Sequence, residues 1–106
     1  MKKIHLKVLD RLLISSILPQ QGGKIEMITA KSIVDMIEFK PDEISELEMK
    51  DNEKGGVSWK VEKDFGKEFS LTAEQLSMLK LCAKELDESR QVSLQNLSLI
   101  QLIEKM

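Results

Sequence analysis

The stretch EFSLTAEQLSML, residues 68–79, contains the sharpest change of pattern in this sequence. Its first part alternates polar and apolar side chains and places Phe69 and Leu71 on one face, which predicts a short β-strand after a turn at residues 65–66. Its second part begins with Thr72 and has Gln75 three residues later, which is the spacing of a capping box at the start of a helix. Apolar residues at helical spacing then continue to about residue 88. The chain therefore combines strands with helices.

A second alternating pattern precedes this strand, on both sides of a loop that contains Gly55 and Gly56. Its apolar members are Leu47, Met49, Val57, Trp59 and Val61. The spacing predicts two half-buried strands, and the glycines suit the reversal because they adopt positive φ at little cost. With the strand at 69–71, these two strands would form an antiparallel three-stranded meander. Trp59, the only tryptophan, is then expected to face the core beneath the terminal helices.

Apolar residues at helical spacing predict further helices on both sides of the strands. The first helix covers about residues 5–18 and ends at Pro19. The second covers about residues 29–38 with Thr29 as its N-cap, and residues 25–28 could form an extended segment leading into it. Pro41 is placed to open one short helical turn, and Ser93 is placed to cap a last, strongly apolar helix.

These elements fit a single α+β domain spanning residues 1–106. In this domain, the three-stranded antiparallel meander packs against the N-terminal and C-terminal helices, which are too apolar to remain uncovered. The composition agrees, since 42% hydrophobic and 32% charged residues are typical of a globular domain. We find no internal repeat and no linker long enough to divide the chain.

The compartment can be inferred from the cysteine content and from the N-terminus. Cys82 is the only cysteine and cannot form a disulfide within the chain, which favours a reducing cytoplasm. Lys7, Asp10 and Arg11 interrupt the apolar N-terminal run, so it does not resemble a signal peptide. No segment approaches the roughly 18 uninterrupted apolar residues of a membrane span, so we expect no membrane partner.

Catalytic, metal and cofactor sites find no support in the sequence. His5 is the only histidine and is expected at the surface near a frayed helix end, and Cys82 lies among apolar neighbours as a small buried residue would. One Cys and one His cannot form a structural zinc site within one chain. The two glycine pairs lack the surrounding residues of a phosphate-binding loop. We therefore expect a protein that is not an enzyme and has no catalytic, metal-binding or cofactor-binding residues.

Nucleic-acid binding is a second possibility, because two helices, a short helical turn and a glycine-containing hairpin occur in the order of a winged helix. The segment that would enter the major groove, residues 41–48, carries four acidic residues and no basic one. Carboxylates repel phosphates, whereas affinity for nucleic acid normally comes from Lys and Arg. The charge pattern thus argues against this function.

Several segments resemble a group of small proteins encoded by bacteriophages and prophages. The resemblance is carried by LDRLLISSILP at residues 9–19, the pair Gly22-Gly23, the turn GGVSW at residues 55–59, and the leucine-rich end. It implies a bacterial cytoplasm, a viral genome and a small accessory or binding factor. It implies no biochemical activity and no functional residues.

By elimination, the sequence favours protein–protein interaction, either with a host or phage protein or between copies of this chain. The apolar helices at the two ends and six methionines are the features that could supply such a surface. The alternative is a degenerate winged-helix protein that binds nucleic acid. An exposed apolar patch would favour the first function, and a basic groove beside the hairpin would favour the second.

Overall fold

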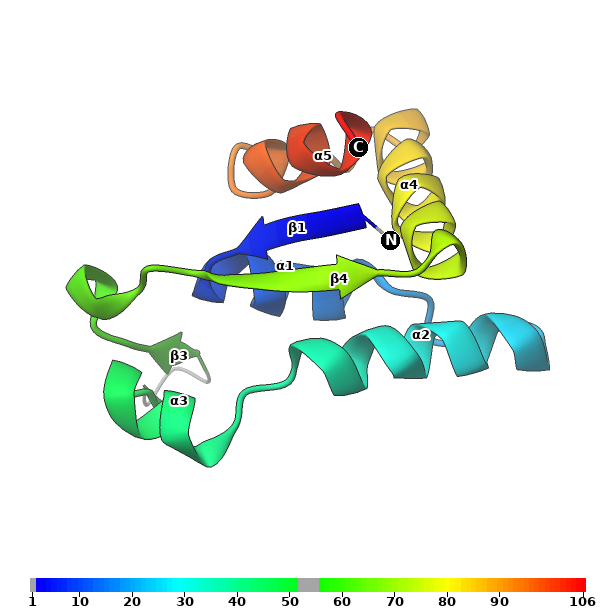
Figure 1. Ribbon diagram of the computed structural model, residues 1–106. Helices are drawn as coiled ribbons and strands as arrows, with labels where there is room; N and C mark the ends of the chain where they lie inside the picture. Colours follow the sequence, from blue (N-terminus) through cyan, green and yellow to red (C-terminus); the bar gives the residue numbers. More distant parts are fainter. Residues whose placement is uncertain (1, 52–55) are drawn as a thin grey trace.

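The computed structural model describes residues 2–51 and 56–106, and its fold is α+β, as the sequence predicted. The elements follow one another as β1 (Lys2–Leu6), α1 (Val8–Ile17), α2 (Lys24–Ile37), α3 (Pro41–Leu47), β2 (Lys50–Asp51), β3 (Val57–Ser58), the 3-10 turn η1 (Val61–Lys63), β4 (Lys67–Leu71), α4 (Ala73–Glu88) and α5 (Leu97–Glu104). Figure 1 shows β1 and β4 side by side at the centre, with α4 and α5 above them and α2 below in this view.

The central sheet pairs β1 with β4 in antiparallel register, so that Ile4 lies opposite Phe69 and His5 opposite Glu68. The prediction of a helix from residue 5 is therefore wrong for its first residues, since His5 and Leu6 belong to a strand and α1 begins only at Val8. The alternation of buried Ile4 and Leu6 with exposed neighbours is the strand period. It was hidden because the apolar residues of α1 follow immediately.

The predicted three-stranded meander is replaced by two separate two-stranded sheets, β1–β4 and β2–β3. The predicted strand at residues 47–49 is wrong at its start, because Leu47 ends α3 and Glu48 closes that helix in the left-handed conformation, with φ of 51°. The strand predicted at residues 57–61 ends at Ser58, and Val61 lies exposed in η1. Four residues of the predicted reversal, 52–55, lie outside the described residues.

Trp59 does not occupy the predicted position in the core beneath the terminal helices. Its side chain is only half-buried, and it does not belong to the main cluster of buried apolar residues. Its indole nitrogen, Nε1, is buried without a hydrogen-bond acceptor among the described residues. The strand alternation on which the prediction depended ends one residue before Trp59.

Two predicted helix starts, at Thr72 and Pro41, are confirmed, whereas the predicted N-caps Thr29 and Ser93 are wrong, because Gly23 caps α2 and Asn96 caps α5. Thr72 caps α4, and the Gln75 amide donates to Thr72 Oγ1 at 3.1 Å while the Thr72 amide donates to Gln75 Oε1 at 2.9 Å. Pro41 occupies the first turn of α3 as predicted. In contrast, α2 begins at Lys24 rather than at residue 29, and α5 begins after Asn96, whose amide donates to Ser93 Oγ.

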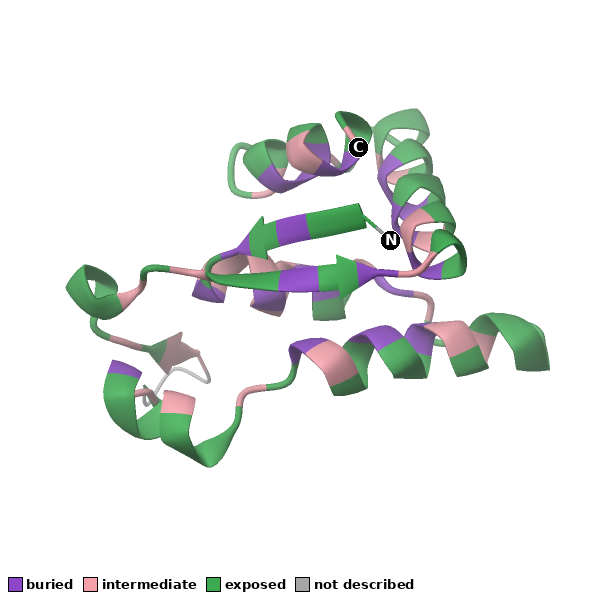
Figure 2. Cartoon of the chain, in the orientation of Figure 1, coloured by how far each residue is buried: buried purple, intermediate pink, exposed green. Residues whose placement is uncertain are grey.

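The core lies between the inner face of the β1–β4 sheet and the helices α1, α2, α4 and α5. Figure 2 shows buried residues along the inward sides of these elements. The most deeply buried large side chains are Ile4, Leu6, Val8, Ile14, Ile33, Ile37, Leu71, Leu79, Leu99, Ile100 and Ile103. Gln75 adds a polar link across the core edge, because its Nε2 donates to Ser32 Oγ on α2 at 3.1 Å.

A smaller part of the molecule projects from this core and comprises α3, β2, β3 and η1 (Figure 1). We call it the small lobe and define it as described residues 41–51 and 56–63. Leu47 is its only buried residue among those described. The small lobe therefore depends on specific polar contacts more than on a hydrophobic core of its own.

Candidate functional site

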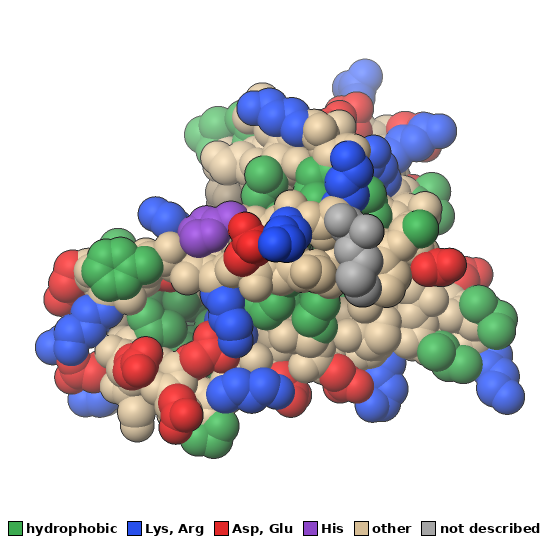
Figure 3. Space-filling model, in the orientation of Figure 1, with side chains coloured by type: hydrophobic (Ala, Val, Ile, Leu, Met, Phe, Trp, Pro, Cys, Tyr) green, Lys and Arg blue, Asp and Glu red, His purple; other side chains and the backbone are tan. Residues whose placement is uncertain are grey.

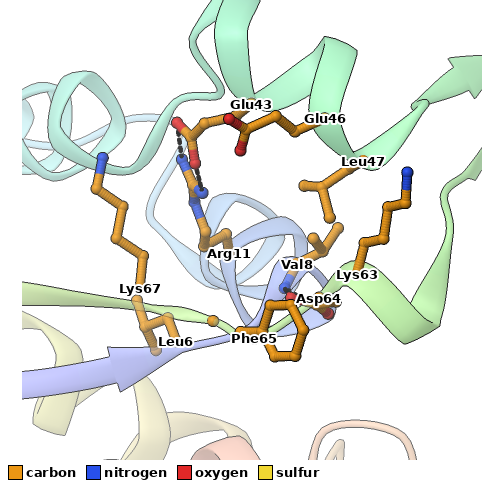
Figure 4. Close-up of a pocket in the computed structure, with 11 residues that line it drawn as sticks. Leu6, Val8, Arg11, Glu43, Glu46, Leu47, Lys63, Asp64, Phe65 and Lys67 are labelled. Carbon is orange, nitrogen blue, oxygen red and sulfur yellow. Dashed lines mark hydrogen bonds and ion pairs between the residues drawn. The ribbon is translucent and has the colours of Figure 1, made fainter.

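The most buried charged group in the described residues is Arg11 of α1, with only 3% of its side chain exposed. Its Nε donates to the carbonyl oxygen of Ile37 at 2.9 Å, and one terminal nitrogen donates to the carbonyl oxygen of Glu38 at 2.8 Å. Both terminal nitrogens also donate to the carboxylate of Glu43, at 2.5 and 3.2 Å. This fork joins α1 to the end of α2 and to α3 (Figure 4).

The Arg11–Glu43 pair borders a cavity of about 300 Å³ between the core and the small lobe. The hydrogen bond from Arg11 lowers the pKa of Glu43 below its ordinary value of 4.5, although partial burial opposes this shift. Arg11 also stacks on Phe39, 4.0 Å from the ring centroid. Because Arg11 already donates to two carbonyls and a carboxylate, its role here is to hold three helices together, and it is not poised for a ligand.

The loop between η1 and β4 is fastened to the start of α1 and to β1. The Val8 amide donates to both carboxylate oxygens of Asp64, at 3.2 and 3.3 Å, which satisfies a backbone group at the N-terminus of α1. His5 Nε2 lies 3.0 Å from the carbonyl oxygen of Phe65. These contacts leave the Phe65 side chain 80% exposed beside the cavity (Figure 4).

Cys82 and His5, the only cysteine and the only histidine of the sequence, lie in different environments. Cys82 is buried on α4, and burial raises the pKa of its thiol, so the unreactive protonated form dominates at neutral pH. His5 is exposed on the outer face of the β1–β4 sheet, where Figure 3 shows it among charged side chains. Within residues 2–51 and 56–106, no three His, Cys, Asp or Glu side chains are grouped as metal ligands would be.

The surface of the small lobe is not basic where a winged helix would contact nucleic acid. Glu48 Oε2 lies 2.6 Å from Lys60 Nζ and 3.5 Å from Lys63 Nζ, so these two lysines, which follow the hairpin, are paired with a carboxylate. The hydrogen bond from Lys60 lowers the pKa of Glu48, and that contact raises the pKa of Lys60. Asp42 and Glu46 on α3 are exposed acids.

An apolar groove of about 410 Å³ lies between the first turns of α2 and the outer face of α4. We call it the α2–α4 groove. Ile25, Met78 and Leu81 supply its apolar side chains, and Ile25 and Leu81 are 76% and 54% exposed. Ile28, one turn after Ile25, is 56% exposed but does not line the groove. Figure 3 shows hydrophobic side chains at this right-hand edge of the molecule, over the N-terminal end of α2.

Two carboxylates, Glu26 and Glu74, also line the α2–α4 groove, and no lysine or arginine does. Each lies in the first turn of its helix, α2 or α4. The helices diverge from the point where Gln75 bonds to Ser32, so the groove is an open corner between two fixed elements. It can accommodate an apolar side chain or a short helix.

The groove could not be predicted from the sequence, because the second helix is expected to begin at about residue 29 and the pattern of residues 25–28 also allows an extended segment. In the structure Gly23 is the N-cap of α2, and Thr29 lies inside the helix, where its hydroxyl donates to the carbonyl oxygen of Ile25. The spacing of Met27, Ala30 and Val34 is helical and is compatible with a helix that begins before residue 29.

Comparison of the chain with protein-family models, with curated proteins and with solved structures found no match. Within the described residues, no helix combines the length and the apolar character needed to cross a membrane.

Proposed function

We propose that this chain is a small non-enzymatic binding protein that contacts another protein through the α2–α4 groove. The observation that carries the proposal is the exposure of Ile25 and Leu81, which line one groove together with Met78. Singly exposed apolar residues are normal, whereas a group of them beside a groove is typical of an interaction site. The expected setting is an accessory or host-directed factor of a bacteriophage or prophage.

The alternative function, nucleic-acid binding by a winged helix, is less well supported. The order of α2, α3 and the β2–β3 hairpin favours it. However, α3 carries exposed acids, and Lys60 and Lys63 after the hairpin are paired with Glu48, so a phosphate backbone would meet little net positive charge.

Quantitative affinity capture from a bacterial lysate tests the proposed function. The double variant Ile25→Ser/Leu81→Ser removes the apolar surface of the groove, and we expect it to recover at least about tenfold less of a protein that the unchanged chain captures in stoichiometric amount. Leu94→Ser is the matched control, because Leu94 is 94% exposed and does not line the groove. Equal recovery by the double variant would refute the site, and recovery of nuclease-sensitive nucleic acid would favour the alternative function.

A further inference from the structure

We propose that the partner segment that occupies the α2–α4 groove is an amphipathic helix with basic residues along the edge of its apolar face. This inference rests on the proposed function and specifies the chemistry of the partner. The groove supplies the apolar part of the match through Ile25, Met78 and Leu81. Its acidic side chains supply the electrostatic part of the match.

The charged side chains that line the groove are all acidic. Glu26 approaches from α2 and Glu74 from α4, so a bound segment would have a carboxylate on each side. The same outer face of α4 continues with Glu85 and Glu88 at helical spacing beyond Leu81. Lys84 is the one base on that stretch, and it already faces Glu88 at 3.9 Å.

The helix dipoles at the groove do not cancel its negative charge. The N-termini of α2 and α4 both lie at the groove, and each contributes roughly half a positive charge. Two carboxylates therefore leave the groove with a net charge of about −1. An apolar surface with negative edges is complementary to a helix whose leucine-like stripe is flanked by Lys or Arg.

A second copy of this chain fits the groove less well than a basic helix does. In a two-fold symmetric dimer the same patch is present on both sides, so Glu26 and Glu74 of one protomer would meet the same carboxylates of its partner. Like charges placed together at an interface are unfavourable. The acidic lining thus selects against self-association at this surface.

The test uses two fluorescein-labelled helical peptides of about 18 residues with the same leucine stripe. One has lysines beside the stripe and the other has glutamates. By fluorescence anisotropy at low salt, we expect the chain to bind the lysine peptide about tenfold more tightly than the glutamate peptide, with a preference that weakens as salt is added. Ile25→Ser/Leu81→Ser is expected to weaken binding of the lysine peptide.

Charge-reversal variants distinguish the effect of the groove carboxylates on peptide binding from the effect of carboxylates elsewhere on the surface. Glu26→Lys/Glu74→Lys is expected to invert the peptide preference, whereas Glu62→Lys/Glu104→Lys changes the net charge equally, reverses acids that do not line the groove, and should leave the preference intact. Circular dichroism checks that each variant is folded. Because both groove acids lie in first helical turns, Glu26→Gln/Glu74→Gln is the milder variant and should abolish the preference without inverting it.

The outcomes are distinct from those of the capture experiment. No binding of either peptide, equal affinity for both, or an equal change in the control variant would overturn the basic-helix inference. The proposed function would still stand if capture of the partner depended on Ile25 and Leu81. Loss of that dependence would instead overturn the proposed function itself.

Discussion

At the scale of single residues, buried Arg11 has the largest set of specific contacts in the described chain. Its guanidinium can serve two backbone carbonyls and one carboxylate together because its donors form a planar fork. Lysine, with one nitrogen, could not reach the same partners. The sequence showed Arg11 only as a charge that interrupts an apolar run, since Ile37, Glu38 and Glu43 are brought to it by tertiary folding.

The Glu43 carboxylate gives this network a pH dependence. Because its pKa is lowered in the folded state, its contribution to stability is complete above the ordinary value of about 4.5 and is lost as the pH falls through the lower folded-state pKa. We expect Glu43→Gln to reduce the free energy of unfolding by about 2 kcal/mol at pH 7. In urea denaturation, the difference from the unchanged chain should shrink below about pH 4.5.

The control for this measurement is Glu62→Gln, which alters an exposed acid of η1 and should change stability by less than about 0.5 kcal/mol. A difference between Glu43→Gln and the unchanged chain that persists undiminished at the lowest pH would show that the Glu43 charge is not the stabilising feature.

Gly66 and His5 form a second residue-scale pair whose coupling can be measured. Gly66 has φ of +77°, and a Cβ added there would lie 2.3 Å from His5 Nε2. We expect Gly66→Ala to cost about 2 to 3 kcal/mol, from left-handed backbone strain and from loss of the His5 contact to the carbonyl oxygen of Phe65. In a His5→Ala background, only the strain of about 1 to 2 kcal/mol should remain. A double-mutant cycle by chemical denaturation with no coupling energy would contradict this arrangement.

At the scale of elements, the start of α4 combines a cap with a link between helices. Thr72→Ala removes the acceptor for the Gln75 amide and should cost about 1 kcal/mol, whereas Thr72→Ser keeps the hydroxyl and should be nearly neutral. Gln75→Ala should cost more, about 2 kcal/mol, because it also leaves the Thr72 amide and the Ser32 hydroxyl without these partners. Thermal or urea unfolding gives the order, and a smaller loss for Gln75→Ala than for Thr72→Ala would contradict the proposed link.

The elements that could be predicted from sequence are those whose signals are local. The capping box of Thr72 and Gln75, the proline of α3, and the alternation of Phe69 and Leu71 each lie within a few residues of the structure they specify. β1 could not be assigned in the same way, because its partner β4 begins about sixty residues later and its two inward apolar residues run directly into the apolar face of α1. The groove was missed for a related reason, since it depends on the crossing of α2 and α4.

At the scale of the whole molecule, pairing of β1 with β4 brings the N-terminal strand next to a strand that lies more than sixty residues later in the chain. The helices before and after the small lobe share one core, and the small lobe lies outside it. Composition and period were sufficient to predict the α+β class. They could not show that the hairpin and the central sheet are separate, because strand pairing is decided by side chains that are distant in sequence.

This arrangement leads to an expectation about local unfolding. The small lobe has one buried residue, Leu47, among those described. Its Glu43 is bonded to Arg11 of the core, and Asp64, the residue that follows the lobe, accepts a hydrogen bond from the Val8 amide. Segments with few buried apolar side chains open at a lower free energy than the core. By native-state hydrogen exchange, we expect small-lobe amides to open at a lower free energy and with weaker urea dependence than amides of β1, β4 and α4. Arg11→Met should hasten small-lobe exchange further. If small-lobe amides instead match the free energy and urea dependence of β1 and β4, the lobe unfolds cooperatively with the core and its polar attachment is stronger than its burial implies.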